Sequence, residues 1–553
     1  MYKLFLCLRY LRRRLIAYFA VAAVGLCVAM VLIVISVMDG FVKKIERAAK
    51  GLFSDIIVIS GSMEGMGLYE EFAAQLRKDV PEVEGSSPFI LTGGTYYVPE
   101  TKVYQTVQIA GVDPISRAQV SDFAKGLWVQ NGATRPTFDP PAAMLLDRLK
   151  EELDRAESLR GEEEKKPGKD KLMPIRLHNA AIGAEDRLIK WRSVEKGYGE
   201  LRLADEAYWA ALGAARGTET PALEKARTRV EELTDKTRLQ PPSKRVIVGL
   251  GLPGISFHTQ RGDTVRRTLP GDRIVLSIVP IGKKTLTDGL VTDRFTVIDD
   301  CETGVSSIDA TFVYMPFRTL QRMVGMEAQY DAENPDRVAS PARCTAIHVK
   351  VKDSLSDERN LRRIRDDIEA SWTRFREANF KADPFGNVGV YTWRQQQDKL
   401  VSQVENQRTL VVIMFAVISL VAIVLIIVIF YMIVMQKTWD IGVLMSMGAS
   451  RPGIAGIFLA YGAAVGLVGA IGGIALGWLF VRQINPISDF IADSFGFRVW
   501  DREFFMFRQI PNEVDPTVVW WIAGSAVLAG LIGAMIPAFR AARMQPVEAL
   551  RYE

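Results

Sequence analysis

Four apolar stretches in this chain are too long to be ordinary buried helices. They contain no Asp, Glu, Lys or Arg, and they cover Leu15–Met38, Leu410–Met435, Gly453–Val481 and Thr517–Phe539. A helix needs roughly 20 apolar residues to cross a hydrocarbon core about 30 Å thick. Each stretch exceeds that length, so the sequence predicts four transmembrane helices.

The first stretch could also be a secretory signal peptide, but two features argue against that interpretation. Its apolar part is longer than the roughly 7–15 residues of a signal-peptide core, and no small-residue cleavage site ends it. The sequence continues instead through Asp39 into the charged residues Lys43, Lys44, Glu46 and Arg47. We expect an uncleaved anchor whose helix projects beyond the membrane.

Basic residues beside the short segments predict the orientation of the chain. A cluster of four arginines precedes the first stretch, and both the loop 437–451 and the tail after Phe539 are also basic. Cytoplasmic segments of membrane proteins carry an excess of Lys and Arg. We expect both termini in the cytoplasm, the helices in a bacterial inner membrane, and residues 39–408 on the far side. The net charge of +5 on 553 residues therefore reflects topology, and no nucleic-acid partner is expected.

The predicted fold is a membrane α-helical bundle of four transmembrane helices, with a large α+β extracytoplasmic domain inserted between helices 1 and 2. We expect the N-terminus, helix 1 and its extension in residues 1–52, the extracytoplasmic domain in 53–394, and the other helices in 395–553. Within that domain, strand-like patterns occur in about 54–140 and 244–350. Residues 141–240 are charged and rich in Ala and Leu, which is typical of solvated surface helices.

Patterns that would indicate enzyme chemistry are weak. Gly249–Gly254 matches the dinucleotide-binding fingerprint after a strand-like run, but that fingerprint requires a helix to begin at its last glycines. Here the sequence leads into turn residues at 261–263. The chain has no G-x-x-x-x-G-K-[ST] run, and its three histidines lack metal-ligand spacing. We expect no catalytic residue, no metal and no cofactor on this chain.

The cysteines divide between the two predicted compartments. Cys7 and Cys27 lie at or in the first membrane helix, where they act as small apolar residues. Cys301 and Cys344 lie in the exported domain, where an oxidising compartment permits a disulfide. A bridge between them is one hypothesis, and two free thiols are the other.

Small residues recur at four-residue spacing in the third apolar stretch. Gly469, Gly473 and Gly477 share one helical face, and Gly462 and Gly466 precede them. Such spacing allows close approach of a second helix, although membrane helices are also rich in glycine in general. The fourth stretch has Ala526, Gly530 and Ala534 in a similar register, which favours close packing.

A short helix is predicted between the second and third apolar stretches. Trp439, Val443 and Met447 are four residues apart, so they share one face of this helix, and Gly448 is suited to end it. Because so short a helix is marginal in water alone, we expect it to rest on another surface. The membrane interface and a groove on a cytoplasmic partner are the two alternatives.

These segments carry a resemblance to a known family. Lys437–Leu444 followed by Met447–Ser450 resembles the cytoplasmic coupling loop of FtsX-like ABC transporter permeases, in the MacB-like superfamily. Ser36–Phe41 and Arg540–Glu553 are similar to the LolC/LolE lipoprotein-releasing branch. The resemblance covers both ends and the later β-rich part of the outer domain, but not the charged insertion.

The resemblance implies a mechanotransmission transporter that releases lipoproteins to a periplasmic chaperone. A separate ATPase would bind ATP and Mg²⁺ and grip the coupling helix, and a second permease chain would be needed, identical or related. Closure of the ATPase would act through helical extensions at 41–50 and 395–407. The implied coupling residues are Lys437, Thr438, Trp439, Asp440, Ile441, Val443, Leu444 and Met447.

The resemblance also implies a loop between β-strands that captures the chaperone. The best positional match is the segment from Pro280 to Asp293, which includes Lys283 and Lys284. Two other functions within the superfamily remain open. One is a MacB-like efflux permease, and the other is an FtsX-like signalling permease that controls envelope hydrolases.

Overall fold

The computed structural model describes most of the chain, and its contacts divide the chain into two units. The described residues are 15–165, 170–237, 239–259, 263–281, 289–331, 334, 337–352, 357–380, 388–396, 398–436, 438–495, 510 and 512–543. The helical unit comprises residues 1–45, 399–500 and 509–553, and the α+β unit comprises 46–398 and 501–508. Each unit is described separately below.

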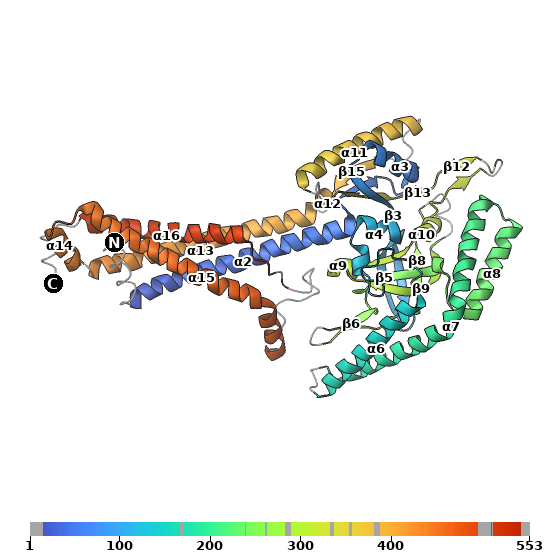
Figure 1. Cartoon of the computed structure of the whole chain (residues 1–553), viewed down its shortest axis with the longest axis horizontal. Helices are drawn as coiled ribbons and strands as arrows, with labels where there is room; N and C mark the ends of the chain where they lie inside the picture. The colour runs from blue at the N-terminus through green and yellow to red at the C-terminus, as the bar shows by residue number, and fades with distance from the viewer. Residues whose placement is uncertain are drawn as a thin grey trace. The chain divides into compact units, whose positions relative to one another are not determined.

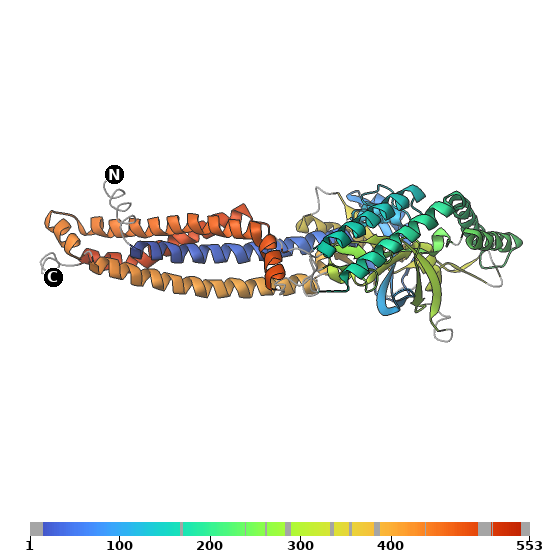
Figure 2. The same ribbon diagram turned by 90° about the horizontal axis from the view of Figure 1, so that it is seen from below.

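Long helices form the helical unit (Figures 1 and 2). They are α2 (Leu15–Phe53), α13 (Asp398–Gln436), α15 (Arg451–Phe495) and α16 (Pro516–Arg543), with the short α14 (Thr438–Ser446) between α13 and α15. Helix α2 runs unbroken past Asp39, as expected for an anchor that projects beyond its apolar stretch.

Three helices in the described part of the chain are long and apolar enough to cross a membrane. The spans are Tyr18–Phe41, Arg451–Ser488 and Pro516–Arg543. The fourth expected span lies in α13, where the described residues show only the shorter apolar helix Ile427–Gln436. The count of four membrane helices therefore stays a prediction.

Helices α2, α15 and α16 share one apolar core. Val24, Val28 and Leu32 of α2 are buried with Val465 of α15 and Ala526 of α16. The described side chains of α13 are largely exposed along its apolar part, including Leu410, Met414, Val417, Val421 and Val424. A water-soluble protein would not leave so long an apolar surface uncovered, which is consistent with a lipid environment.

A nine-stranded mixed sheet forms the centre of the α+β unit. Its order is β15-β1-β14-β3-β4-β10-β5-β9-β8, and β8 also pairs with β3. The strands are β1 (Ile56–Ser60), β3 (Val83–Val98), β4 (Val103–Val112), β5 (Arg245–Gly249), β8 (Arg273–Ile278), β9 (Val291–Cys301), β10 (Phe312–Pro316), β14 (Ala346–Val351) and β15 (Val388–Thr392).

The long strand β3 pairs with three different strands. Its first half pairs with β14, whereas Gly94–Tyr97 pairs with β4 on one side and β8 on the other. Strands β3, β4, β10, β5, β9 and β8 therefore close into a ring. A Cβ at Gly94 would lie 2.7 Å from the backbone oxygen of Ser277 in β8 and 2.6 Å from a methyl of Ile109, so glycine permits this closure.

Two helices cover the part of the sheet outside the ring. Helix α3 (Tyr69–Asp79) meets α11 (Glu358–Asn379) through Phe72, whose ring lies 4.9 Å from that of Trp372 and 5.3 Å from that of Phe375. The buried residues of α11 recur every three or four positions, as an amphipathic helix requires. They are Leu361, Ile364, Ile368, Trp372 and Phe375.

Short elements complete the α+β unit. The short helices are α4 (Pro114–Val120), α5 (Phe123–Gly126), η1 (Pro242–Lys244), α9 (Ser306–Asp309), α10 (Phe317–Met323) and α12 (Trp393–Gln396). The paired short strands are β2 (Met66–Gly67) with β13 (Arg343–Cys344), β6 (Ser256–His258) with β7 (Thr264–Arg266), and β11 (Gln329–Tyr330) with β12 (Val338–Ser340).

The charged insertion is not simply solvated, which corrects the sequence interpretation. It forms α6 (Ala142–Lys165), α7 (Met173–Ala215) and α8 (Pro221–Thr237), with α6 and α7 side by side (Figures 1 and 2). Leu145, Leu149 and Trp191 lie in the same core as the sheet residues Ile247 and Ile298. The indole Nε1–H of Trp191 donates to the backbone oxygen of Pro270 at 2.9 Å.

Buried ion pairs also fix the insertion to the ring. Arg266 donates from Nη2 to Asp300 at 3.1 Å and from Nη1 to Glu152 of α6 at 3.4 Å, and all three side chains are buried. Arg245 at the start of β5 pairs with Asp139 and donates to the hydroxyl of Tyr198 in α7 at 2.8 Å. Charge patterning alone did not reveal these partners, because they are distant in sequence.

The glycine-rich run after β5 forms turns, as the sequence analysis expected. The N–H of Leu252 bonds the backbone oxygen of Gly249 at 3.1 Å, and Gly254 has a φ of +88°. The short strand β6 follows at Ser256. No helix begins at these glycines, so the run lacks the phosphate-facing N-terminus of a dinucleotide site.

Candidate functional site

The short helix α14 begins at a turn held by Thr438. The hydroxyl of Thr438 is buried and donates to the backbone oxygens of Met435 at 2.8 Å and Val434 at 3.3 Å. These two oxygens belong to the last turn of α13, where no further intrahelical N–H would reach them. Thr438 therefore satisfies the end of one helix while it starts the next.

Gly448 ends α14 in the expected way. Its φ is +93°, and its N–H donates to the backbone oxygen of Met445 at 3.1 Å. The N–H of Ala449 donates to the backbone oxygen of Leu444 at 3.0 Å. This pair of bonds is the Schellman arrangement, which favours glycine at the left-handed position. The predicted cap is confirmed, and α14 is closed at both ends by local chemistry.

The inner face of α14 packs onto the ends of three other helices. Ile441 is only 3% exposed and lies in a cluster with Val434 of α13, Ile454 of α15 and Ala541 of α16. Helix α14 is therefore anchored within the helical unit. Met445 of α14 is partly buried and packs against the same cluster.

Two large apolar side chains are exposed on the outer side of α14, one within the helix and one immediately after its last residue. Trp439 is 58% exposed and Met447 is 80% exposed, with Val443 partly exposed between them. Leu444 is partly buried, Lys437 lies outside the described residues, and the side chain of Asp440 is not described. The face predicted from the spacing is thus the outward face, and exposed Trp and Met are typical of contact surfaces.

Basic residues surround the same end of the helical unit. Arg540 and Arg543 are exposed on either side of Ala541, and the guanidinium of Arg540 lies 5.4 Å from the ring centre of Tyr431. Arg451 is exposed at the start of α15. The sequence analysis did not single out Ala541, although a pair of small residues between two arginines was a signal of helix packing.

The glycines of α15 form two packing seams rather than one. A Cβ at Gly469 would lie 2.7 Å from a methyl of Val24, one at Gly473 would lie 2.4 Å from the backbone oxygen of Gly25, and one at Gly477 would lie 3.2 Å from Ala29. These three glycines therefore let α15 approach α2 at backbone distance. The matching segment of α2 was not identified from the sequence.

The second seam joins α15 to α16. A Cβ at Gly462 would lie 2.4 Å from the Cβ of Ala534, and one at Gly466 would lie 2.8 Å from the backbone oxygen of Ala526. A Cβ at Gly530 would lie 2.5 Å from the backbone oxygen of Gly462. The small residues noted in both helices thus pack against one another.

The candidate chaperone loop lies between β8 and β9. Lys283 and Lys284 lie outside the described residues, and Pro280 is partly buried just after β8. Asp293 lies within β9, where its carboxylate pairs with Lys244 at 2.8 Å. The described residues therefore place the segment at a hairpin connection and do not test its role.

Cys301 and Cys344 are separate free thiols, which corrects the hypothesis of a bridge. Both are fully buried, Cys301 at the end of β9 and Cys344 in β13. Burial raises the pKa of both thiols. The two cysteines lie in strands that do not pair with each other.

Comparison with known families agrees with this arrangement. Residues 412–546 match the FtsX-like permease C-terminal family, and residues 18–160 match the MacB-like periplasmic core domain. The chain therefore contains an FtsX-like permease C-terminal domain and a MacB-like periplasmic core domain. The second match ends within α6, so α7 and α8 lie outside both matched regions.

Among characterised branches, the similarity is to LolC and LolE proteins. The chain is 23% identical to the lipoprotein-releasing system transmembrane protein LolC of Xylella fastidiosa (strain 9a5c) over 260 residues, which are 47% of this chain and 55% of that protein. It is 28% identical to LolC of Neisseria meningitidis serogroup B over 166 residues, 30% of this chain and 40% of that protein. An uncharacterized ABC transporter permease of Methanocaldococcus jannaschii is 30% identical over 193 residues, 34% of this chain and 44% of that one. The matches span about half the length of these relatives.

Proposed function

We propose that this chain is the permease subunit of an ABC transporter that releases lipoproteins from the inner membrane, driven by an ATPase on a separate chain. Two acyl chains anchor a protein stably in a bilayer, so release of such a protein requires driven work. The similarity to LolC and LolE proteins supports the choice of cargo.

The exposed face of α14 carries the proposal of a coupling role. A helix that is capped at both ends and anchored by Ile441 presents Trp439 and Met447 outward. This arrangement transmits force well, because a push on the exposed side chains reaches α13, α15 and α16 through one packed cluster. The ATPase would bind there on the cytoplasmic side, with both termini of the chain on that side.

The remaining parts of the proposal rest on the similarity to this family. A second permease chain, identical or related, would complete the transporter, and a periplasmic chaperone would accept the cargo near the β8–β9 connection. ATP and Mg²⁺ would bind the ATPase rather than this chain.

Depletion of the chain in its native bacterium tests the choice of cargo. We expect lipoproteins to accumulate in the inner-membrane fraction, and wild-type chain to restore their normal distribution. Val443→Arg, which places a charge on the outer face of α14, should fail to restore it while present at the wild-type level in membranes. Trp520→Ala, which changes an exposed aromatic residue in α16 away from α14, is the control.

Two results would contradict the proposed cargo. An unchanged lipoprotein distribution with increased sensitivity to exported compounds would favour the MacB-like efflux function. An unchanged distribution with impaired cell-wall cleavage would favour the FtsX-like signalling function.

A further inference from the structure

Helix α15 carries an arginine at each end of its uncharged run. Arg451 and Arg482 are both exposed, and no Asp, Glu, Lys or Arg lies between them. At 1.5 Å per residue the two arginines are about 46 Å apart along the helix. A bilayer with both of its headgroup layers is about 40–45 Å thick. When α15 crosses a membrane, Arg451 therefore reaches one headgroup layer and Arg482 reaches the other.

The antiparallel helix α16 locates Arg482 relative to the rest of the helical unit. Gly462 of α15 packs against Gly530 of α16. Farther along α15, the side-chain amide of Asn485 donates to the backbone oxygen of Ile510 at 3.1 Å and accepts the N–H of Ile510 at 2.9 Å. Arg482 lies between these two contacts and close to the second, so it is level with the residues just before α16.

The start of α16 has the features of a membrane boundary. Just before the helix, Asp515 pairs with Lys43 of α2 at 3.3 Å. Trp521 in the second turn is 78% exposed, and exposed tryptophans are typical of the level at which hydrocarbon meets headgroups. From Trp521 to Arg540 the helix rises about 28 Å, close to the roughly 30 Å of the hydrocarbon core. Two helices therefore give the same boundary.

The side chain of Arg482 stacks on an aromatic residue one turn earlier. Its guanidinium carbon lies 5.4 Å from the centre of the Trp478 ring, and Trp478 is 47% exposed. In the part of the chain that the structure describes, no carboxylate pairs with this guanidinium. Stacking uses the face of the guanidinium, whereas its N–H donors lie in its plane. Those donors suit phosphate oxygens, which guanidinium groups bind in a bidentate manner.

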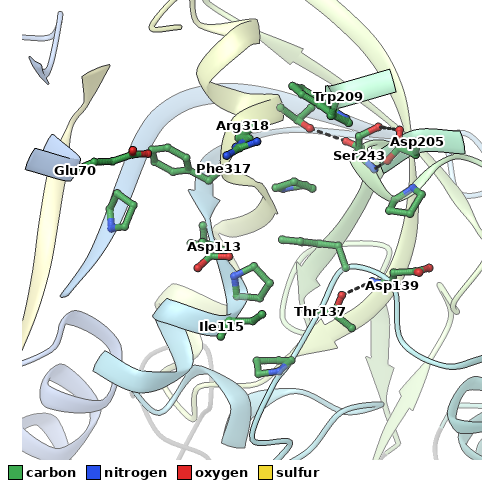
Figure 3. Close-up of a pocket in the computed structure, with 18 of the residues that line it drawn as sticks. Glu70, Asp113, Ile115, Thr137, Asp139, Asp205, Trp209, Ser243, Phe317 and Arg318 are labelled. Atoms are coloured by element: carbon green, nitrogen blue, oxygen red, sulfur yellow. Dashed lines mark hydrogen bonds between the residues drawn. The ribbon is translucent and has the colours of Figure 1, made fainter. Parts of the chain in front are cut away.

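A hollow in the α+β unit provides a contrast (Figure 3). It has a volume of about 550 Å³ and is lined by residues of α7 and of the sheet. Two of its carboxylates already have partners within the protein, because Asp139 pairs with buried Arg245 and Asp205 accepts the hydroxyl of Ser243 at 2.7 Å. These groups are satisfied without a ligand, whereas the described residues give Arg482 no acidic partner.

We propose that Arg482 and Trp478 bind the phosphate group of a membrane phospholipid, in the leaflet opposite the one beside α14. Arg482 donates to the phosphate oxygens, and Trp478 holds the guanidinium at the boundary of the hydrocarbon. The phosphate offsets the cost of a charge beside the apolar core and fixes the height of α15 in the bilayer. The proposal rests on the helical unit crossing a membrane, and it holds whichever cargo the transporter moves.

Photocrosslinking of a lipid to the full chain in detergent tests the proposal. The probe is a phosphatidylglycerol with a diazirine close to its headgroup, and mass spectrometry of peptides locates the label. We expect labelling around Arg482, and about fivefold less of it in Arg482→Gln, which removes the charge. Arg482→Lys should retain part of the labelling, since an ammonium still attracts phosphate but lacks the bidentate geometry. Arg192→Gln, at an exposed arginine of α7, is the matched control.

A second variant covers the case in which Arg482→Gln does not fold. Trp478→Leu keeps an apolar side chain but removes the ring beneath the guanidinium, so labelling should fall about two- to fivefold. The unfolding temperature of each variant shows whether the bundle is intact.

Three outcomes would overturn the proposal. Labelling around Arg482 could be undiminished in folded Arg482→Gln or Trp478→Leu. A photoreactive diacylglycerol, which lacks the phosphate, could label the same peptides as strongly as the phospholipid. Inorganic phosphate could also displace the probe at the probe's own concentration, which would show a site for a free anion rather than for a lipid.

Discussion

Neighbouring glycines of α15 differ in what an added methyl group would meet. A Cβ at Gly473 would lie 2.4 Å from the backbone oxygen of Gly25 and 2.7 Å from Val28, whereas one at Gly472 has no atom within 4 Å. The two positions are adjacent in sequence, and both are glycine. Only the contact with α2 distinguishes a glycine that packs from one that does not.

Gly473→Ala should destabilise the contact between α2 and α15. Because the nearest atom is backbone and cannot rotate away, we expect a loss of about 1–3 kcal/mol, measured by thermal unfolding of the purified chain in detergent. Gly472→Ala should leave the unfolding temperature unchanged. Equal effects of the two substitutions would show that α2 does not pack on this seam.

Asp299 is a buried carboxyl group whose pKa affects stability. It accepts N–H groups of Trp128, Val129 and Gln130 at 3.1, 2.8 and 3.2 Å. Burial, reinforced by the charge of Asp300, raises the pKa of Asp299 to about 7. The folded chain therefore keeps this proton over a range in which the unfolded chain, with a pKa near 3.9, has lost it.

The sign of the resulting pH dependence follows from that proton. The contribution of Asp299 to stability is complete below about pH 4, falls as pH rises and levels off above about pH 7. Asp299→Asn should remove a decrease on the order of 2 kcal/mol between about pH 5 and 8. Unfolding midpoints across this range, with Glu71→Gln as control, measure the slope. An identical slope in Asp299→Asn and wild type would contradict the prediction.

At the scale of elements, neighbouring side chains of α6 have different roles: one attaches the insertion to the ring, and the next is exposed to solvent. Glu152 of α6 is 5% exposed and accepts the backbone N–H of Arg266 at 2.9 Å, whereas its neighbour Glu151 is 62% exposed and pairs with Arg148. One carboxylate joins two elements, and the other stabilises only its own helix.

Glu152→Gln should therefore lower the free energy of unfolding far more than Glu151→Gln does. Loss of a charged partner from the buried Arg266 should lower the free energy of unfolding by about 1–3 kcal/mol. Loss of the exposed pair should cost less than about 0.5 kcal/mol. Chemical denaturation of the full chain measures both values. A small effect of Glu152→Gln would show that the insertion is held mainly by apolar contacts such as those of Trp191.

Local patterns predicted much of this architecture. Uncharged length predicted the long helices of the helical unit, four-residue spacing predicted the shared face of α14, and Gly448 predicted its end. These features depend on residues close together in sequence. Closure of the ring at Gly94, the partners of Arg266 and the two seams of α15 depend on residues far apart in sequence. One sequence does not reveal such pairings, so the insertion was predicted to be more solvated than it is.

At the scale of the whole molecule, the chain combines a helical unit with a large α+β unit. The helical unit has an outward-facing helix at its basic end, and the α+β unit carries an insertion beyond the matched core domain. The proposed transporter function would require an ATPase on one side of the membrane and a substrate or partner on the other. The role of α14 therefore decides whether the transporter function holds.

Purification of the tagged chain from native membranes in mild detergent, followed by mass spectrometry, tests that role. We predict a P-loop ATPase in near-stoichiometric amount with the wild-type chain and with Trp520→Ala. The double variant Trp439→Ala with Met447→Ala should retain the fold but capture at least tenfold less ATPase, because exposed aromatic anchors at interfaces often contribute about 2 kcal/mol or more. Absence of an ATPase from the wild-type sample even after crosslinking, or undiminished capture by the double variant, would contradict the role of α14 as the coupling helix.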